Sequence, residues 1–224
     1  LYRELGELSL SGFTTKAQLT WQQASKQAVK PFPSGTAWGT KWEYGWFRTQ
    51  VTVPESAAGE RLMLHLGAGP EMLVFVNGKE RGSIDRQHNM VELTAEAVPG
   101  EKFDILAEVY AGHGIRPENG GLYARDAVPV PEPPKYQCIV GKSHFGVWRE
   151  DIFQCYADYH TLYELWKTMP DRELRTMKIG EALQQFTYIA DFEAEEPERS
   201  RSILQADELL KPLLESKNGG TVPE

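Results

Sequence analysis

Four aromatic side chains gather within nine positions early in the chain: Trp38, Trp42, Tyr44 and Trp46. Aromatic rings stack on the apolar C–H faces of sugars and bury a large area at a small cost in side-chain entropy. The same rings can instead fill a protein core, because strand alternation would place the last three on one face. The cluster is a candidate for carbohydrate binding or for a domain interface.

A second polar group lies in the glycine-rich segment 111–124. It contains His113, Arg116 and Asn119, whose side chains can hydrogen-bond sugar hydroxyls or contact a neighbouring domain. Loops of this length in compact domains are often functional. A solvated loop is the alternative interpretation.

No catalytic or metal-binding constellation is recognisable. Hydrolysis of a glycosidic bond needs two carboxylates facing each other across the bond, and none of the 32 acidic residues sits in a recognisable motif. Cys155, Asp158 and His160 are close in sequence, but their spacing does not suit one helix face. His65 and His144, like the other histidines, are isolated in the sequence. We therefore expect no catalytic residue and no metal site in this chain.

Short antiparallel strands are expected to position these groups over residues 1–150. The expected strands cover 46–53, 61–67, 71–76, 79–83, 88–93 and 103–111, with one long strand or a pair in 136–149. The dipeptide Asn77-Gly78 predicts a tight hairpin. Strands of this length, joined by glycine and proline turns, indicate an antiparallel β-sandwich.

From residue 151 to 224, apolar residues at spacings of three and four predict about three helices. The second should present one apolar face, formed by Ile179, Ala182, Leu183, Phe186, Ile189 and Ala190. Asp171 is expected to cap this helix. Pro197 is expected in the first turn of the third helix, and Pro212 should kink or end it. Helices with one apolar face need a partner, which the sandwich and a downstream domain can supply.

Charge and cysteine content narrow the class of protein. Residues 1–150 carry 16 basic and 17 acidic side chains, and residues 151–224 carry 8 basic and 15 acidic. Neither part is basic, so nucleic acid is not an expected partner. The apolar runs are too short for a membrane span, and the start, Leu1, shows no signal peptide. Cys138 and Cys155 are expected to be reduced thiols, which suits a cytoplasmic protein.

Three segments, 46–54, 59–66 and 73–80, resemble the sugar-binding-type jelly-roll sandwich of glycosidases, which is related to galactose-binding modules. This domain precedes the catalytic barrel in family 2 β-glycosidases and the catalytic domain in one branch of the family 38 α-mannosidases. Segment 31–39 and the helical tail favour the mannosidase branch, because an immunoglobulin-like sandwich follows in family 2. The resemblance covers about residues 30–215.

The resemblance implies an enzyme whose chemistry lies elsewhere. Family 38 enzymes are retaining, with an aspartate nucleophile and a zinc ion held partly by a His-x-Asp motif. This chain reaches Glu224 without that motif. We therefore expect an N-terminal fragment without cofactor, and zinc in the catalytic domain of the parent. That downstream domain is the expected partner. Carbohydrate and a second copy of the chain stay open as partners, and no membrane contact is expected.

The leading functional hypothesis is a non-catalytic domain of an α-mannosidase. In two alternatives the chain binds sugar: as an autonomous carbohydrate-binding module, or as the N-terminal sugar-binding domain of a family 2 β-glycosidase. A third alternative is a purely structural or oligomerisation element.

Overall fold

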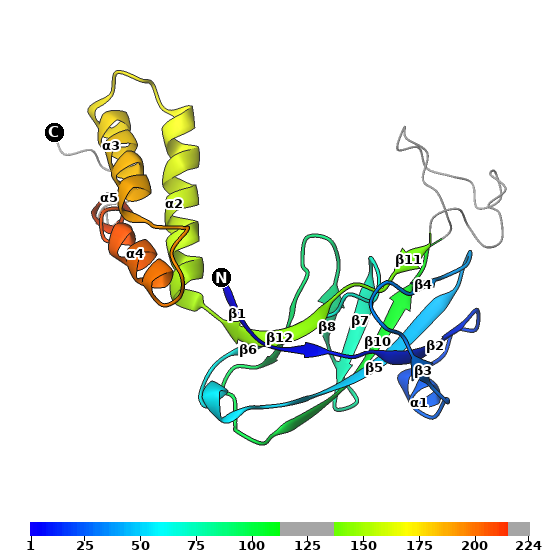
Figure 1. The fold of residues 1–224 in the computed structure, drawn as a ribbon. Coiled ribbons are helices and arrows are strands. Elements are labelled where there is room, and N and C mark those ends of the chain that lie inside the picture. Colours follow the sequence, from blue (N-terminus) through cyan, green and yellow to red (C-terminus); the bar gives the residue numbers. More distant parts are fainter. Residues whose placement is uncertain (113–136, 215–224) are drawn as a thin grey trace, which may run out of the picture. The chain divides into compact units, whose positions relative to one another are not determined.

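The computed structural model describes residues 1–112 and 137–214. The chain divides into two compact units, one of Tyr2–Trp148 and one of Arg149–Glu224 together with Leu1. The first unit consists mainly of β-sheets, and the described part of the second is helical (Figure 1).

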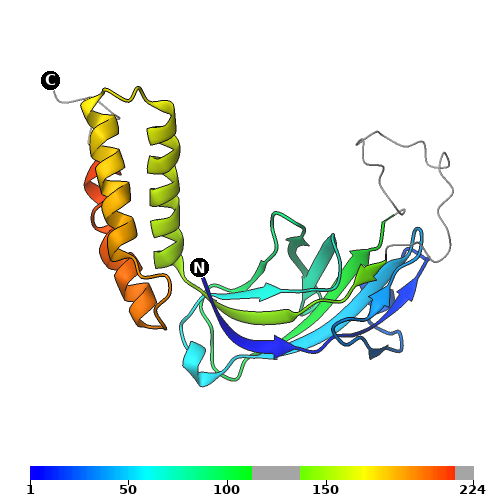
Figure 2. The ribbon, with the colours of Figure 1, turned by 45° about the horizontal axis from the view of Figure 1, so that its top comes forward.

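Two antiparallel sheets form the layers of the first unit (Figures 1 and 2). In spatial order, the four-stranded sheet contains β1 (Tyr2–Leu8), β12 (Ser143–Trp148), β6 (Leu62–His65) and β9 (Val91–Thr94). The six-stranded sheet contains β3 (Lys30–Pro31), β2 (Ser11–Thr15), β5 (Tyr44–Thr52), β10 (Lys102–Tyr110), β7 (Met72–Val76) and β8 (Lys79–Ile84). A small third sheet pairs β11 (Cys138–Ile139) with β4 (Ala37–Trp38). The expected antiparallel sandwich is confirmed.

The strands form where apolar side chains alternate. In β6, Leu62 and Leu64 are fully buried, whereas His65 is half-exposed on the opposite face. The hairpin between β7 and β8 turns at Asn77 and Gly78, with φ values of 50° and 75°. Two left-handed residues in succession give the turn whose twist matches the flanking strands. The predicted hairpin is therefore confirmed.

One core lies between the two larger sheets. Phe47 and Val51 reach it from the six-stranded sheet, and Leu64 and Val147 reach it from the four-stranded sheet. Each of these side chains is at most 1% exposed. Burial of apolar area from both sheets therefore holds the sandwich together.

A second apolar cluster covers the outer face of the six-stranded sheet. Trp46, Phe75 and Leu106 pack there against Ala24 of the short helix α1 (Trp21–Ala24). Arg48 fastens this helix, since its Nη2 donates to the carbonyl oxygen of Ala24 at 2.7 Å. Alternate residues of β5 therefore face two different clusters. A 3-10 turn, η1 (Glu55–Ala57), follows β5.

The helical unit contains α2 (Glu150–Thr168), α3 (Leu174–Ile189), α4 (Glu198–Asp207) and the short α5 (Lys211–Leu214). Its core contains Cys155, Leu162, Ile179, Leu183, Phe186, Ala190, Ala206 and Leu210. The apolar face expected for α3 is confirmed, because four of its six residues are buried and the other two pack against this core.

The predicted helix boundaries need correction. Asp171 does not cap α3, because the helix begins at Leu174 after Glu173. The backbone N–H of Glu173 bonds the carbonyl oxygen of Pro170 at 3.2 Å, so Asp171 lies inside a turn. Pro197 precedes α4 instead of lying in its first turn.

Pro212 neither kinks nor ends α4, which stops earlier, at Asp207. A tight turn follows, in which the N–H of Leu210 bonds the carbonyl oxygen of Asp207 at 2.9 Å. This turn buries the Leu210 side chain completely. Pro212 lies in the first turn of α5, where its missing N–H costs no hydrogen bond.

Candidate functional site

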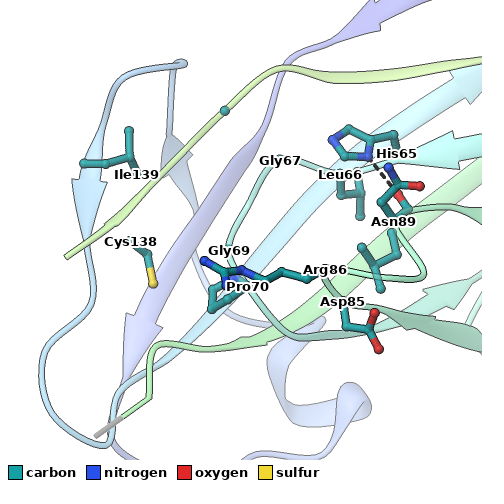
Figure 3. A pocket seen from close by; sticks show the side chains of 12 residues that line it. His65, Leu66, Gly67, Gly69, Pro70, Asp85, Arg86, Asn89, Cys138 and Ile139 are labelled. Carbon is teal, nitrogen blue, oxygen red and sulfur yellow. Dashed lines mark hydrogen bonds between the residues drawn. The ribbon is translucent and has the colours of Figure 1, made fainter. Parts of the chain in front are cut away.

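The sandwich unit contains an open cleft with a volume of about 350 Å³ (Figure 3). Three segments that are distant in sequence line it. Residues 65–70 follow β6, residues 84–89 connect β8 to β9, and residues 138–141 contain β11. Pairing within the sheets therefore assembles the cleft.

One glycine, Gly67, lets two cleft-lining segments approach closely. Gly67 donates its backbone N–H to Ser143 Oγ at 2.9 Å and accepts a hydrogen bond from the N–H of Gly141 at 2.6 Å. A Cβ atom at Gly67 would lie 2.6 Å from the backbone oxygen of Lys142. Only glycine fits there without a backbone shift. The two segments can therefore form this wall of the cleft because residue 67 has no side chain.

Trp38 supports the segment that lines the cleft. Its indole Nε1 donates to the carbonyl oxygen of Ala68 at 2.8 Å, and its ring packs edge-on against Phe47 at 5.1 Å. The Trp38 side chain is only 4% exposed. From the core, Trp38 therefore holds the segment 66–70 in place through Ala68.

The turn 85–89 carries two charged side chains. Asp85 Oδ1 accepts hydrogen bonds from the backbone N–H groups of Gln87 and His88, both at 2.7 Å. These bonds hold the pKa of Asp85 below its usual value, so the carboxylate is charged near neutral pH. Arg86 extends across the cleft toward Gly69 and Pro70 (Figure 3). Within residues 1–112 and 137–214, its guanidinium has no hydrogen-bond or ion-pair partner.

His65 borders the cleft, and a contact with the backbone of Asn89 sets which ring nitrogen of the neutral imidazole carries the hydrogen. The distance from His65 Nδ1 to the carbonyl oxygen of Asn89 is 2.7 Å. A carbonyl can only accept, so Nδ1 carries the hydrogen and Nε2 of the neutral ring is left as an acceptor. The Asn89 side-chain amide has no partner among the described residues. Figure 3 shows His65 and Asn89 at the same end of the cleft.

His65 and His144, isolated in the sequence, are neighbours in the structure. Pairing of β6 with β12 places them opposite each other, and their rings stack at 4.8 Å. His144 Nδ1 lies 3.0 Å from the hydroxyl of Tyr2. Burial, and next the charge of His65, lower the pKa of His144. The two rings therefore form a stacked pair.

The structure does not bring the four predicted aromatic residues onto one surface. Trp38 lies in the core between the sheets, whereas Trp46 is fully buried in the outer cluster and stacks on Phe75 at 6.3 Å. Tyr44 joins that outer cluster and is half-exposed. Trp42 precedes β5 with a left-handed φ of 64°, so strand alternation does not extend to it.

The other predicted site residues, His113, Arg116 and Asn119, lie outside the described residues.

Arg86, Asn89, His65 and Cys138 line the cleft, and none of them was among the predicted site residues. One signal was available. Residues 85–89 are all polar and separate two strands, but the expected strand started at 88 whereas β9 starts at Val91. His65 and Cys138 could be assigned to the cleft only once the pairing of the strands was known.

Neither a metal site nor a membrane span is found in the described part. No three His, Cys, Asp or Glu side chains of residues 1–112 and 137–214 come together as metal ligands would. None of the helices in those ranges is long and apolar enough to cross a membrane.

Comparison with known proteins identifies the family. A family model described as "Alpha-mannosidase, jelly roll domain" matches residues 7–133, more than half of the chain. The chain belongs to the alpha-mannosidase jelly-roll domain family. The resemblance to family 38 α-mannosidases and the jelly-roll fold class are thereby confirmed.

This jelly-roll chain is 22% identical over 186 residues to alpha-mannosidase 2C1 of Homo sapiens, covering 81% of the chain and 17% of the relative. For alpha-mannosidase 2C1 of Mus musculus, the identity is 21% over 195 residues, covering 85% of the chain and 18% of the relative. The jelly-roll chain thus spans less than a fifth of these relatives.

A solved β-glucuronidase from Ruminococcus gnavus, in complex with D-glucuronic acid, aligns with a TM-score of 0.42 and 14% identity. This alignment covers 66% of the jelly-roll chain and 29% of that chain.

Proposed function

We propose that this chain is the non-catalytic N-terminal part of an α-mannosidase, and that a downstream catalytic domain hydrolyses α-mannosidic bonds. The family match carries the proposal, together with the small share of the relatives' length that the chain spans. The two free thiols, Cys138 and Cys155, support a cytoplasmic location for the enzyme, since thiols stay reduced there.

The composition of the cleft supports a non-catalytic role. A glycosidase needs two carboxylates flanking the scissile bond. Asp85 is the single carboxylate among the residues that line the cleft, and two backbone N–H groups already occupy its Oδ1. The described residues also do not fit a zinc ion. We therefore place the retaining, zinc-dependent chemistry in the downstream domain.

The helical unit is the proposed contact for that downstream domain. Large apolar side chains remain exposed on it, including Tyr188 at 71%, Phe192 at 57% and Tyr156 at 54%. Exposed apolar residues of this kind suit a protein interface. A second copy of the chain is the alternative occupant, and sedimentation of the chain alone distinguishes the two, because a monomer favours the downstream domain.

Hydrolysis of an aryl α-mannoside tests the proposed function. The 224-residue chain should give no turnover, whereas a longer protein that includes the downstream domain should hydrolyse the substrate and lose activity with a zinc chelator. An inactive longer protein, or turnover by the chain alone, would contradict the proposal.

A further inference from the structure

We propose that the cleft of Figure 3 is a binding site for one neutral pyranose ring, held by Arg86, Asn89 and the Nε2 atom of His65. This assigns a ligand to the jelly-roll unit itself, beyond its role as an accessory to a catalytic domain. The argument rests on the size of the cleft, its surface chemistry and its charge.

The size and walls of the cleft suit a sugar ring. A volume of about 350 Å³ lies at the lower end of the range for small-molecule sites. Pro70 is exposed and Ile139 is 56% exposed, so both bring apolar atoms to the lining. A pyranose presents apolar C–H faces to such surfaces and directs its hydroxyls sideways.

The polar groups of the cleft offer both donors and acceptors. The Arg86 guanidinium only donates, His65 Nε2 accepts, and the Asn89 amide does both. Arg86 and the Asn89 amide have no competing partner within the described ranges. A sugar hydroxyl donates and accepts at the same time, so neighbouring hydroxyls match this mixture better than a ligand that only accepts.

The charge of the cleft favours a neutral ligand. Asp85, held ionised by the backbone of its own turn, and Arg86 both line the cleft, with their charged ends pointing apart (Figure 3). These two side chains together give the lining no net charge, so a phosphate or carboxylate ligand would gain from Arg86 and lose to Asp85.

The choice of an α-mannoside among pyranoses rests on the proposed function, because the family is named for α-mannosidases. Methyl α-mannoside is accordingly the probe. Its titration into the isotope-labelled 224-residue chain, followed by backbone amide NMR shifts, should move residues 65–70 and 85–89 with saturation at millimolar ligand.

Two variants test the assigned contacts. Arg86→Ala and Asn89→Ala should each weaken binding about tenfold, which corresponds to about 1.4 kcal/mol. Both side chains are exposed, so the melting temperature should stay unchanged. Arg172→Ala, in the exposed turn before α3, is the matched control and should bind like the parent chain.

Cysteine protection gives an independent readout. Cys138 lines the cleft, whereas Cys155 is 2% exposed in the core of the helical unit. Saturating methyl α-mannoside should slow alkylation of Cys138 and leave the rate at Cys155 unchanged. Unchanged alkylation of Cys138 would contradict binding in this cleft.

The outcomes separate this inference from the proposed function. Absence of shifts at the cleft, with an α-mannosidase active in its longer form, overturns the sugar site and leaves the proposed function standing. Equal binding of methyl galactoside supports the pyranose site and contradicts its link to mannose. Tighter binding of inorganic phosphate or glucuronate overturns the assignment of a neutral ligand.

Discussion

Gly67 and Gly141 meet where two cleft-lining segments touch, but their surroundings differ. A Cβ atom at Gly67 would lie 2.6 Å from backbone atoms of both Gly141 and Lys142, closer than Cβ atoms approach in real proteins. At Gly141 the nearest atoms would be 3.7 and 3.8 Å away, which is ordinary contact. Comparing substitutions at the two positions therefore tests whether the close backbone approach at Gly67, and not the loss of a glycine as such, affects stability.

Gly67→Ala should lower the free energy of unfolding of the sandwich by about 1–3 kcal/mol, because the backbone must shift to admit the methyl group. Gly141→Ala is the matched control and should cost much less. Denaturant titration of both variants measures the difference. Equal losses would show that the close contact at Gly67 is not what constrains the cleft.

The His65–His144 pair predicts a pH dependence of stability. The folded pKa of His144 lies below its usual 6.5 because of burial and the His65 charge, with Lys142 adding and Glu4 and Glu7 opposing. As the pH falls below 6.5, the unfolded chain takes up this proton first, so the free energy of unfolding decreases until the folded pKa is reached.

His144→Gln should remove this part of the pH dependence. Urea unfolding of the sandwich at about pH 7.5 and about pH 5.5 measures it. His160→Gln, a histidine exposed on α2, should leave the slope as it is. A slope that survives in His144→Gln would contradict the role given to the pair.

Residue type alone could not assign the roles of single side chains. Trp38 and Trp46 stand out in the sequence for the same reason, yet one supports the cleft through Ala68 and the other fills the outer cluster. The face that each occupies depends on where β4 and β5 begin. Arg86 and Asn89 look like residues of any polar turn in the sequence, and only strand pairing places them in one cleft with His65.

At the scale of elements, the sequence predicted those features that depend on neighbouring residues alone. The Asn77-Gly78 hairpin and the apolar face of α3 follow from backbone preference and side-chain spacing. Strand β1 is half-exposed along its length, and β3 and β4 have two residues each, so these carry no periodic signal. The cap expected at Asp171 failed because Pro170 begins a turn that delays α3.

Ile179→Ala tests whether that face of α3 holds the helical unit together. Ile179 is completely buried, so the truncation should lower the free energy of unfolding of this unit by about 2–5 kcal/mol. Met177, 54% exposed on the same helix, is the control, and Met177→Ala should cost less than about 0.5 kcal/mol. Helical circular dichroism during denaturation measures both. Similar losses would contradict the assigned face.

At the scale of the whole molecule, the composition of the chain indicated two parts, and the structure divides at Trp148 and Arg149. The sandwich class could be predicted because each strand is indicated by the alternation and turn residues of its own segment. The cleft could not, because residues 65–70, 84–89 and 138–141 meet only through long-range pairing. The remaining question at this scale is where the proposed α-mannosidase chemistry lies.

Covalent trapping of the nucleophile answers that question most directly. A retaining glycosidase forms a glycosyl-enzyme intermediate, which an activated 2-deoxy-2-fluoro or 5-fluoro mannoside can trap. The longer protein would be labelled, digested and analysed by mass spectrometry. The account predicts a single labelled carboxylate in sequence downstream of residue 224. A label on any residue from 1 to 224 would contradict it.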